Sequence, residues 1–408
     1  MDSSPPIISL RPLRDPELNE CTKATVHQIE ASFKTYGCVC IPLSDLDTAE
    51  EDGQELLSRC YRAAESFFTL PETVKMEFTE EEASPKGFGG SCYTPLGKEP
   101  AYKEGEKQHV ESFSCTRPVD EALCGHLPRG PELHRSLFPD SKVPGFGAAY
   151  SSLWENLRER ICLPMMRALE DMLQLPRGFL LRKSSEMESL NMSLLRTLRY
   201  PIQDTQRPSP GRLAEDRVKR RRSARNQVPV DVGISEHSDF EVFTIMHQES
   251  KGLHLRTPSR RRLARWYQLP FRQDTLTVIL GDMAELWTAG WLEATRHKVV
   301  SPAPGQGVRK SLVLFQAHDD LVKVHPLETT HLAPHVPGPE SSTGDTRNQS
   351  DSNSGVREHV EEGPAADSFQ EWVKDGPRSR RKCYLPTTQG AWVRRQELHA
   401  KSTLGKLP

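Results

Sequence analysis

The sequence lacks the features that mark membrane-spanning and secreted proteins. No apolar run approaches the roughly 20 residues that a membrane span requires. The first residues, Met-Asp-Ser-Ser-Pro-Pro, lack the basic and then apolar pattern of a secretory signal. The nine cysteines include no Cys-x-x-Cys pair, so free thiols in a reducing compartment are the simplest interpretation. We therefore expect a cytoplasmic protein that does not bind membranes.

Strong charge of one sign and a high apolar content are also missing. The net charge of −2 gives no overall attraction to nucleic acid, and apolar residues make up only 36% of the chain. Two polar segments account for the low apolar content: residues 203–228, with a basic run at 217–225, and residues 327–380, rich in Pro, Gly, Ser and Asn. We expect the first to be a surface loop and the second to be disordered. The basic run also fits a nuclear-localisation or nucleic-acid patch, which keeps the nucleus and a nucleic-acid partner open as alternatives.

The first half of the chain has the periodicity of helices. Apolar residues at helical spacing predict helices over residues 22–36, 57–68 and 146–175. Pro164 lies inside the third of these and should kink or split it. A short strand is expected at residues 39–42.

From Ser193 onward the pattern changes to short apolar runs separated by turn residues. The strand candidates are residues 193–200, 241–247, 252–256, 275–281, 298–300 and 310–317. Many short strands in one stretch are typical of a sandwich or a jelly roll. The sequence therefore predicts a mainly β fold with flanking helices, in which the helical part comes first.

Two histidines and one aspartate in this β-rich part suit a metal ion. His237 and Asp239 are two residues apart, so in extended backbone both side chains project to the same side. His297 follows about 60 positions after His237 and must arrive from a distant strand. Two imidazoles and one carboxylate form the facial triad that binds Fe(II) and leaves other positions open.

A second pair of residues suits a carboxylate. Arg309 and Ser311 repeat the spacing of two, which places a guanidinium fork and a hydroxyl on one face of a strand. Such a pair fits a planar carboxylate group. A metal with open positions beside a carboxylate receptor is what a 2-oxo acid needs to chelate iron and be anchored at its far end.

Taken together, these segments resemble those of a known family, the isopenicillin N synthase-like 2-oxoglutarate/Fe(II)-dependent dioxygenases. The resemblance covers roughly residues 7–325 and resumes near Tyr384. The matching segments are Gly37-Cys-Val-Cys-Ile-Pro42, Phe67-Phe68-Thr-Leu-Pro71, Tyr200-Pro201, Gly233-Ile-Ser-Glu-His-Ser-Asp-Phe240, Gly252-Leu-His-Leu255, Leu280-Gly-Asp282, Trp287-Thr-Ala-Gly290 and Ala294-Thr-Arg-His-Lys-Val299.

The resemblance implies cofactors and residue roles. Fe(II) would be held by His237, Asp239 and His297, with 2-oxoglutarate as co-substrate, O2 as oxidant and ascorbate as an optional reductant. Arg309 and Ser311 would bind the distal carboxylate of 2-oxoglutarate. Tyr200 matches a family tyrosine that often hydrogen-bonds the co-substrate, although Leu198 stands where many members carry an asparagine.

The resemblance also implies a more specific fold, a distorted double-stranded β-helix (jelly roll) with a helical N-terminal region. We divide the chain into a helical and mixed region at 1–190 and a catalytic jelly-roll domain at 191–326, with the basic loop inserted at 203–228. Residues 327–380 form the disordered insertion. Residues 381–408 form a C-terminal segment that returns to cap the mouth of the barrel.

The activity implied by the resemblance is oxidation, in the first instance hydroxylation, of a small organic molecule by a monomer, with release of succinate and CO2. Three alternatives stay open: a 2-oxoglutarate-independent oxidase like isopenicillin N synthase itself, a nucleic-acid-directed oxygenase, and a non-enzymatic interaction module. In the resembled family, variable segments at the mouth of the barrel recognise the substrate. We expect those segments at residues 84–115 and after Tyr384.

Overall fold

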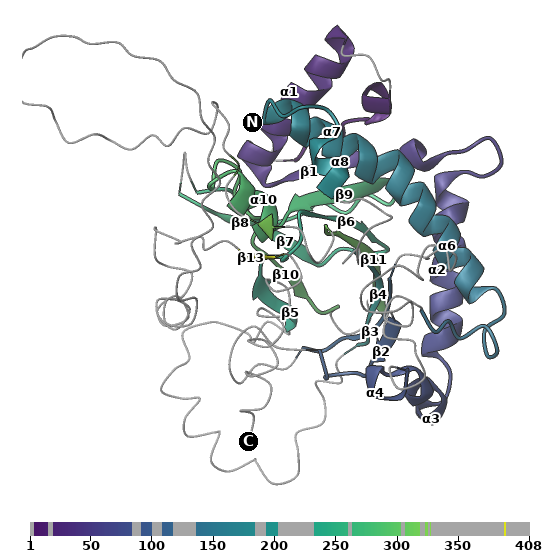
Figure 1. Cartoon of the computed structure of the whole chain (residues 1–408). Helices are drawn as coiled ribbons and strands as arrows, with labels where there is room; N and C mark the ends of the chain where they lie inside the picture. The colour runs from purple at the N-terminus through teal and green to yellow at the C-terminus, as the bar shows by residue number, and fades with distance from the viewer. Residues whose placement is uncertain are drawn as a thin grey trace, which may run out of the picture.

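Antiparallel sheets form the centre of the fold (Figure 1). The computed structural model describes residues 4–14, 19–83, 91–99, 108–116, 136–183, 193–202, 232–259, 263–302, 307–318, 323–324, 327 and 387–388. Within them a seven-stranded sheet has the order β1-β9-β6-β11-β4-β3-β2, a four-stranded sheet has the order β5-β10-β7-β8, and β12 pairs with β13. The strands are β1 (Cys38–Pro42), β2 (Ser91–Thr94), β3 (Glu111–Thr116), β4 (Leu194–Tyr200), β5 (Val232–His237), β6 (Phe243–Gln248), β7 (Leu253–Arg256), β8 (Trp266–Gln268), β9 (Thr275–Leu280), β10 (His297–Val300), β11 (Arg309–Gln316), β12 (Lys323–Val324) and β13 (Thr387–Thr388).

Helices cover the outer face of the larger sheet, and the smaller sheet lies on its inner side (Figure 1). The helical elements are η1 (Arg11–Arg14), α1 (Glu20–Tyr36), η2 (Leu43–Leu46), α2 (Gly53–Phe68), α3 (Glu72–Lys75), η3 (Met76–Phe78), α4 (Glu80–Ala83), α6 (Phe146–Leu157), η6 (Arg158–Cys162), α7 (Leu163–Met172), α8 (Phe179–Lys183) and α10 (Asp282–Trp287). None of the described helices is long and apolar enough to cross a membrane.

Helix α1 shows why its segment is helical and where it stops. The side chain of Asn19 accepts a hydrogen bond from the Thr22 N–H and caps the first turn. Gly37 ends the helix with φ of 76°, a left-handed conformation that favours glycine, and its N–H donates to Phe33 O at 2.9 Å. The predicted helix and its stop are confirmed, with a start two residues earlier than expected.

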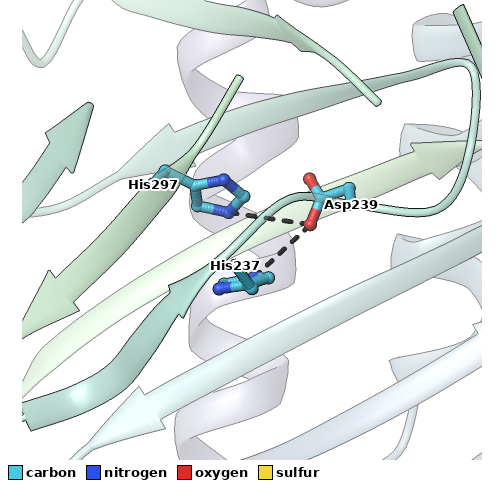
Figure 2. Close-up of side chains that lie close together, drawn as sticks. All are labelled: His237, Asp239 and His297. Atoms are coloured by element: carbon cyan, nitrogen blue, oxygen red, sulfur yellow. Dashed lines mark ion pairs between the residues drawn. The ribbon is translucent and has the colours of Figure 1, made fainter. Parts of the chain in front are cut away.

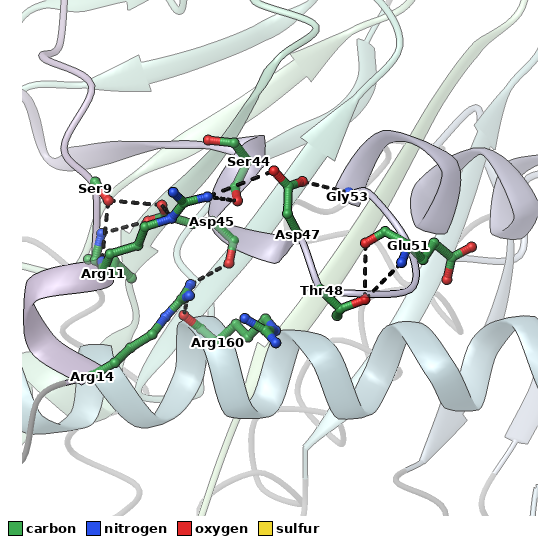
Figure 3. Close-up of polar contacts among 11 residues, drawn as sticks. Ser9, Arg11, Arg14, Ser44, Asp45, Asp47, Thr48, Glu51, Gly53 and Arg160 are labelled. Carbon is green, nitrogen blue, oxygen red and sulfur yellow. Dashed lines mark hydrogen bonds and ion pairs between the residues drawn. The ribbon is translucent and has the colours of Figure 1, made fainter.

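Pro164 splits the third predicted helix, as expected. The turn just before it, η6, is a π-helix that separates α6 from α7. Proline has no N–H, so the carbonyl of Arg160 four residues earlier loses its helical partner. Arg14 Nη2 donates to that carbonyl at 3.4 Å, which joins the N-terminal segment to the break in the helix (Figure 3).

The N-terminal segment is held to the sheet by one buried carboxylate (Figure 3). Asp45 is buried and accepts hydrogen bonds from Ser9 Oγ at 2.8 Å and from Leu10 N at 2.6 Å. Arg11 Nε lies 3.4 Å from the same carboxylate. This places Ile7 beside Cys40 of β1 in a parallel bridge and extends the edge of the larger sheet.

The space between the two sheets is lined by alternate residues of each strand. Leu198, Met246 and Val313 of the larger sheet pack there with Leu255 and Val299 of the smaller one. The registers β11–β4 and β11–β6 place every second residue of these strands on the same inner face. The inner face therefore carries the side chains that can meet a ligand between the sheets.

The mainly β fold with flanking helices is confirmed, and the six strand candidates after Ser193 all appear. Six strands were not predicted: β2, β3, β5, β8, β12 and β13. The larger sheet takes β1, β2 and β3 from before residue 190, so that boundary marks a change in composition within a continuous sheet. The basic loop at 203–228, the insertion at 327–380 apart from Leu327, and the tail at 381–408 apart from β13 lie outside the described residues.

Candidate metal centre

The three predicted ligands meet at one buried point (Figure 2). Strands β5 and β10 pair so that His237 and His297 stand opposite each other, and Asp239 follows β5 by two residues. Asp239 Oδ1 lies 3.5 Å from His237 Nε2 and 3.6 Å from His297 Nε2. One ligand atom from each residue lies within 4.8 Å of the others, and all three side chains are buried. Two nitrogens and one oxygen thus converge from segments far apart in the sequence.

Backbone carbonyls fix the orientation of both imidazoles. His237 Nδ1 lies 2.8 Å from Ser235 O, and His297 Nδ1 lies 3.0 Å from Thr295 O. A carbonyl oxygen can only accept, so in each neutral ring Nδ1 carries the proton. The unprotonated Nε2 of each ring then faces Asp239, which is the arrangement required of a metal-binding histidine.

The ionisation states of the cluster also suit a metal. Burial would raise the pKa of Asp239, but the neighbouring imidazoles, His297 first, and the hydroxyl of Thr244 favour its ionised form and lower that pKa to about 2. Burial, and next the charge of His237, lower the pKa of His297 to about 4. Near neutral pH the carboxylate is therefore ionised and His297 is neutral, the forms that bind a cation. Thr244 Oγ1 donates to Asp239 Oδ2 at 2.5 Å and holds the carboxylate in place.

The Gly-Asp pair after β9 supports the loop that carries Asp239. The Asp282 N–H donates to Asp239 O at 2.8 Å. A Cβ added at Gly281 would lie 2.1 Å from Glu241 O and 3.1 Å from Asp239 O. Only glycine fits between these carbonyls, because a real Cβ does not approach backbone so closely. Asp282 also accepts from Ser238 Oγ at 2.8 Å, so both its backbone and its side chain hold the loop.

Arg309 is a buried cation that is suited to an anionic ligand. Its side chain is 2% exposed and lies on the inner face. Nη2 donates to Gln248 Oε1 at 3.0 Å, and Nη1 lies 3.5 Å from Ser311 Oγ. Among the described residues no carboxylate lies within ion-pair distance, and Nε has no hydrogen-bond partner. A buried charge without a counter-ion is costly, so the donor set fits a carboxylate brought by a ligand.

Tyr200 lies beside Arg309, opposite it in the β4–β11 register. The Arg309 guanidinium carbon is 4.7 Å from the centre of the Tyr200 ring. Burial raises the pKa of Tyr200, and the charge of Arg309 and hydrogen bonds with Ser311 and Arg309 oppose the shift. Leu198, at the position where many members of the resembled family have asparagine, is buried on the same inner face.

Three supporting residues were missed from the sequence. Gln248 stands opposite Ser311 in the β6–β11 register and binds Arg309. Thr244 binds Asp239, and Gln108 binds Ser235, whose carbonyl orients His237. Neutral side chains carry no spacing signal of their own, and only the strand registers reveal them.

Family models match this chain in two places. A model described as the 2OG-Fe(II) oxygenase superfamily matches residues 217–318, and one described as the non-haem dioxygenase in morphine synthesis N-terminal region matches residues 5–136. The first range contains all three metal-ligand candidates as well as Arg309 and Ser311.

Curated relatives agree with these matches. A 2-oxoglutarate-Fe(II) type oxidoreductase of Metarhizium majus is 25% identical over 63% of this chain and 69% of its own length. A 2-oxoglutarate-dependent dioxygenase of Talaromyces stipitatus is 23% identical over 71% of this chain and 78% of its own length.

Solved structures share the fold. A full-length protein of Neurospora crassa, solved in complex with alpha-KG, superposes with a TM-score of 0.62 at 15% identity, covering 98% of this chain and 96% of the Neurospora chain. A 2OG-Fe(II) oxygenase family protein from Caulobacter crescentus gives a TM-score of 0.60 at 19% identity, covering 97% of this chain and 98% of its own. The double-stranded β-helix expected from the sequence is confirmed.

Proposed function

Because this chain belongs to the 2OG-Fe(II) oxygenase superfamily and is an Fe(II)- and 2-oxoglutarate-dependent dioxygenase, we propose that it oxidises a small organic molecule between its two sheets. His237, Asp239 and His297 would hold the iron. The observation that carries this assignment is the convergence of three buried ligand atoms within 4.8 Å. Hydroxylation is the expected outcome, with desaturation or ring closure as variants of the same chemistry.

The metal and its co-substrate supply the power to break a C–H bond, as O2 and 2-oxoglutarate are converted with release of succinate and CO2. The protein must bind and orient the substrate and shield the reacting centre from water. Its two imidazoles present Nε2 and its carboxylate presents Oδ1, so these three residues would hold the ion and leave its remaining positions to ligands.

Arg309 would anchor the far end of 2-oxoglutarate. The guanidinium fork offers two parallel donors to a carboxylate, and Ser311 adds a hydroxyl on the same face. Gln248 holds the fork from the neighbouring strand, which orients it before the ligand arrives. Tyr200 flanks the guanidinium and completes the wall on the β4 side.

The apolar residues between the sheets would exclude water from the reacting centre. Leu198, Met246 and Val313 face the smaller sheet beside the polar groups already named. A dry site strengthens the electrostatic contacts to bound anions and protects reactive species from water.

The remaining parts of the proposal concern partners and compartment. We propose a monomer in a reducing compartment such as the cytoplasm. The seven cysteines among the described residues are free thiols, which supports such a compartment. Cell fractionation with a tagged full-length chain tests the compartment, and a secreted, disulfide-bonded product would contradict it.

Succinate formation tests the proposed activity. Purified protein reconstituted with Fe(II) should convert 2-oxoglutarate to succinate slowly without substrate and faster with it. His254→Ala is a matched control, because His254 lies on β7 beside β10 and outside the ligand cluster. The control should form succinate at the wild-type rate, and His297→Ala should form none. Equal rates in both variants would contradict the assignment.

A further inference from the structure

Two arginines project from the inner face of the larger sheet, and they differ in their partners. Among the described strands, alternation places Arg309 and Arg196 there and no other charged residue. Arg309 has no carboxylate of the described residues beside it. Arg196 has one: its Nη1 lies 2.7 Å from Glu99 Oε1. Its Nε also donates to Ser114 Oγ on β3 at 2.8 Å.

Arg196 lies close to the metal side of the site. Arg196 on β4 pairs with Val313 on β11, and the next inner-face residue of β11 is Phe315. The guanidinium carbon of Arg196 is 5.7 Å from the centre of the Phe315 ring. Phe315 in turn stands opposite Thr244, which binds Asp239. Strand β11 separates β4 from β6, and neighbouring strands are about 4.8 Å apart, so Arg196 and Thr244 lie two strand spacings, about 10 Å, apart across the sheet and one inner-face position apart along it.

The side chains of Arg196 and Glu99 are 21% and 11% exposed, so both keep surface that a ligand can touch.

Protein stability alone does not explain the Arg196–Glu99 ion pair. A buried ion pair is about as stable as well-packed apolar residues of the same size, because desolvation offsets the attraction. The outer face has its own pair at the same strand: Arg199 Nη1 lies 2.7 Å from Glu111 Oε1, and Lys75 joins it at 2.9 Å. That cluster packs the helices, whereas the Arg196–Glu99 pair faces the site.

We propose that Arg196 and Glu99 determine substrate specificity by recognising a neutral polar group, of the amide type, that accepts a hydrogen bond from the guanidinium and donates one to the carboxylate. The proposal rests on the proposed function and names the substrate class for that site. An anionic group would meet the Glu99 carboxylate, and a cationic group would meet Arg196, so each suffers repulsion that a neutral group avoids. The aromatic ring of Phe315 supplies an apolar contact for the rest of the molecule.

Three matched probes test the charge preference: phenylacetamide, phenylacetate and phenethylamine. Each is titrated without O2 into protein loaded with Fe(II) and 2-oxoglutarate, and binding is read from the change in the metal-to-co-substrate charge-transfer band. Phenylacetamide should bind the wild type about tenfold or more tightly than the other two, the effect of one charge-assisted hydrogen bond.

Substitution of Glu99 or Arg196 should change which probe binds most tightly, rather than only weaken the binding of all three. Glu99→Gln leaves Arg196 uncompensated, so phenylacetate should become the tightest probe. Arg196→Gln leaves Glu99 uncompensated, so phenethylamine should become the tightest. Arg199→Gln removes an ion pair of the outer face and should keep the wild-type order, which controls for general loss of stability.

The outcomes separate this proposal from the enzyme's activity. Absence of the band before any probe is added would contradict the proposed metal and co-substrate site itself, and this proposal with it. With the band present, tightest binding of phenylacetate to the wild type would overturn the proposal. An unchanged order in both Glu99→Gln and Arg196→Gln, or binding of none of the three probes, would overturn it as well.

Discussion

Gln108 and Ser235 exchange two hydrogen bonds at the edge of the smaller sheet. Gln108 Nε2 donates to Ser235 Oγ at 2.8 Å, and the Ser235 N–H donates to Gln108 Oε1 at 2.9 Å. The Ser235 carbonyl accepts from His237 Nδ1. Strand β5 is the edge of its sheet, so Gln108 takes the place of a neighbouring strand and fixes the backbone that orients His237.

Gln108→Ala should weaken Fe(II) binding while the chain stays folded. Loss of groups that orient a metal ligand typically costs about 10- to 100-fold in metal affinity. Anaerobic metal titration measures the effect, and Gln54→Ala, at an exposed position of α2, is the control. Wild-type affinity in Gln108→Ala would show that β5 holds His237 without this contact.

Arg309→Lys should bind 2-oxoglutarate about 10- to 100-fold less tightly than the wild type. The lysine keeps the positive charge but loses the fork, and a charge-assisted hydrogen bond is worth about 1.5–3 kcal/mol. Titration of the Fe(II)-loaded variant with 2-oxoglutarate checks this. An unchanged affinity would mean that another group anchors the distal carboxylate.

Gly281→Ala should destabilise the loop that carries Asp239. The added methyl group would overlap Glu241 O at 2.1 Å, so the loop must move. Gly307→Ala is the comparison, because Gly307 has φ of +79° and no atom within 4 Å, and its cost is backbone strain alone, about 1 kcal/mol. Thermal unfolding should show a clearly larger loss for Gly281→Ala. Equal losses would mean that the loop accommodates the methyl group.

Glu111 should contribute stability that is lost in acid. Burial would raise the pKa of Glu111, but hydrogen bonds from Tyr93, Lys75 and Arg199 lower it below 4.5. A carboxyl with a lowered folded-state pKa stabilises the protein above its unfolded pKa and loses that contribution as the pH falls through the folded value.

Glu111→Gln should therefore be less stable than the wild type near neutral pH, by about 3 kcal/mol for a broken buried pair. The difference in unfolding free energy between the variant and the wild type should narrow as the pH falls below 4.5. Denaturant unfolding at a series of pH values measures it. A gap that does not depend on pH would show that the charge of Glu111 adds nothing.

The metal-ligand cluster could be predicted from the sequence because two of its three residues lie close together in the chain. His237 and Asp239 are two residues apart, and the chemistry of iron limits what such a pair with His297 can do. The strands after Ser193 were also predictable, because their apolar runs are continuous. The Arg309–Ser311 spacing predicted a shared face, and the β11 register agrees with it.

Other parts could not be predicted, because they depend on long-range pairing. Strand β3, Glu-Ser-Phe-Ser-Cys-Thr, has a weak strand pattern and is defined by its pairing with β4. The contacts of Gln108 and Glu99 cross 127 and 97 positions of the chain. The disorder at 327–380 stays a prediction; its first residue, Leu327, is buried and donates to Trp287 O at 2.9 Å.

Anaerobic Fe(II) titration of the wild type beside Asp239→Ala tests the central claim most directly. The account predicts one tightly bound Fe(II) per wild-type chain. Asp239→Ala should lose tight binding, because it removes the only carboxylate of the cluster. His254→Ala, from the neighbouring strand, should bind like the wild type. Tight binding of one Fe(II) by Asp239→Ala would contradict the account.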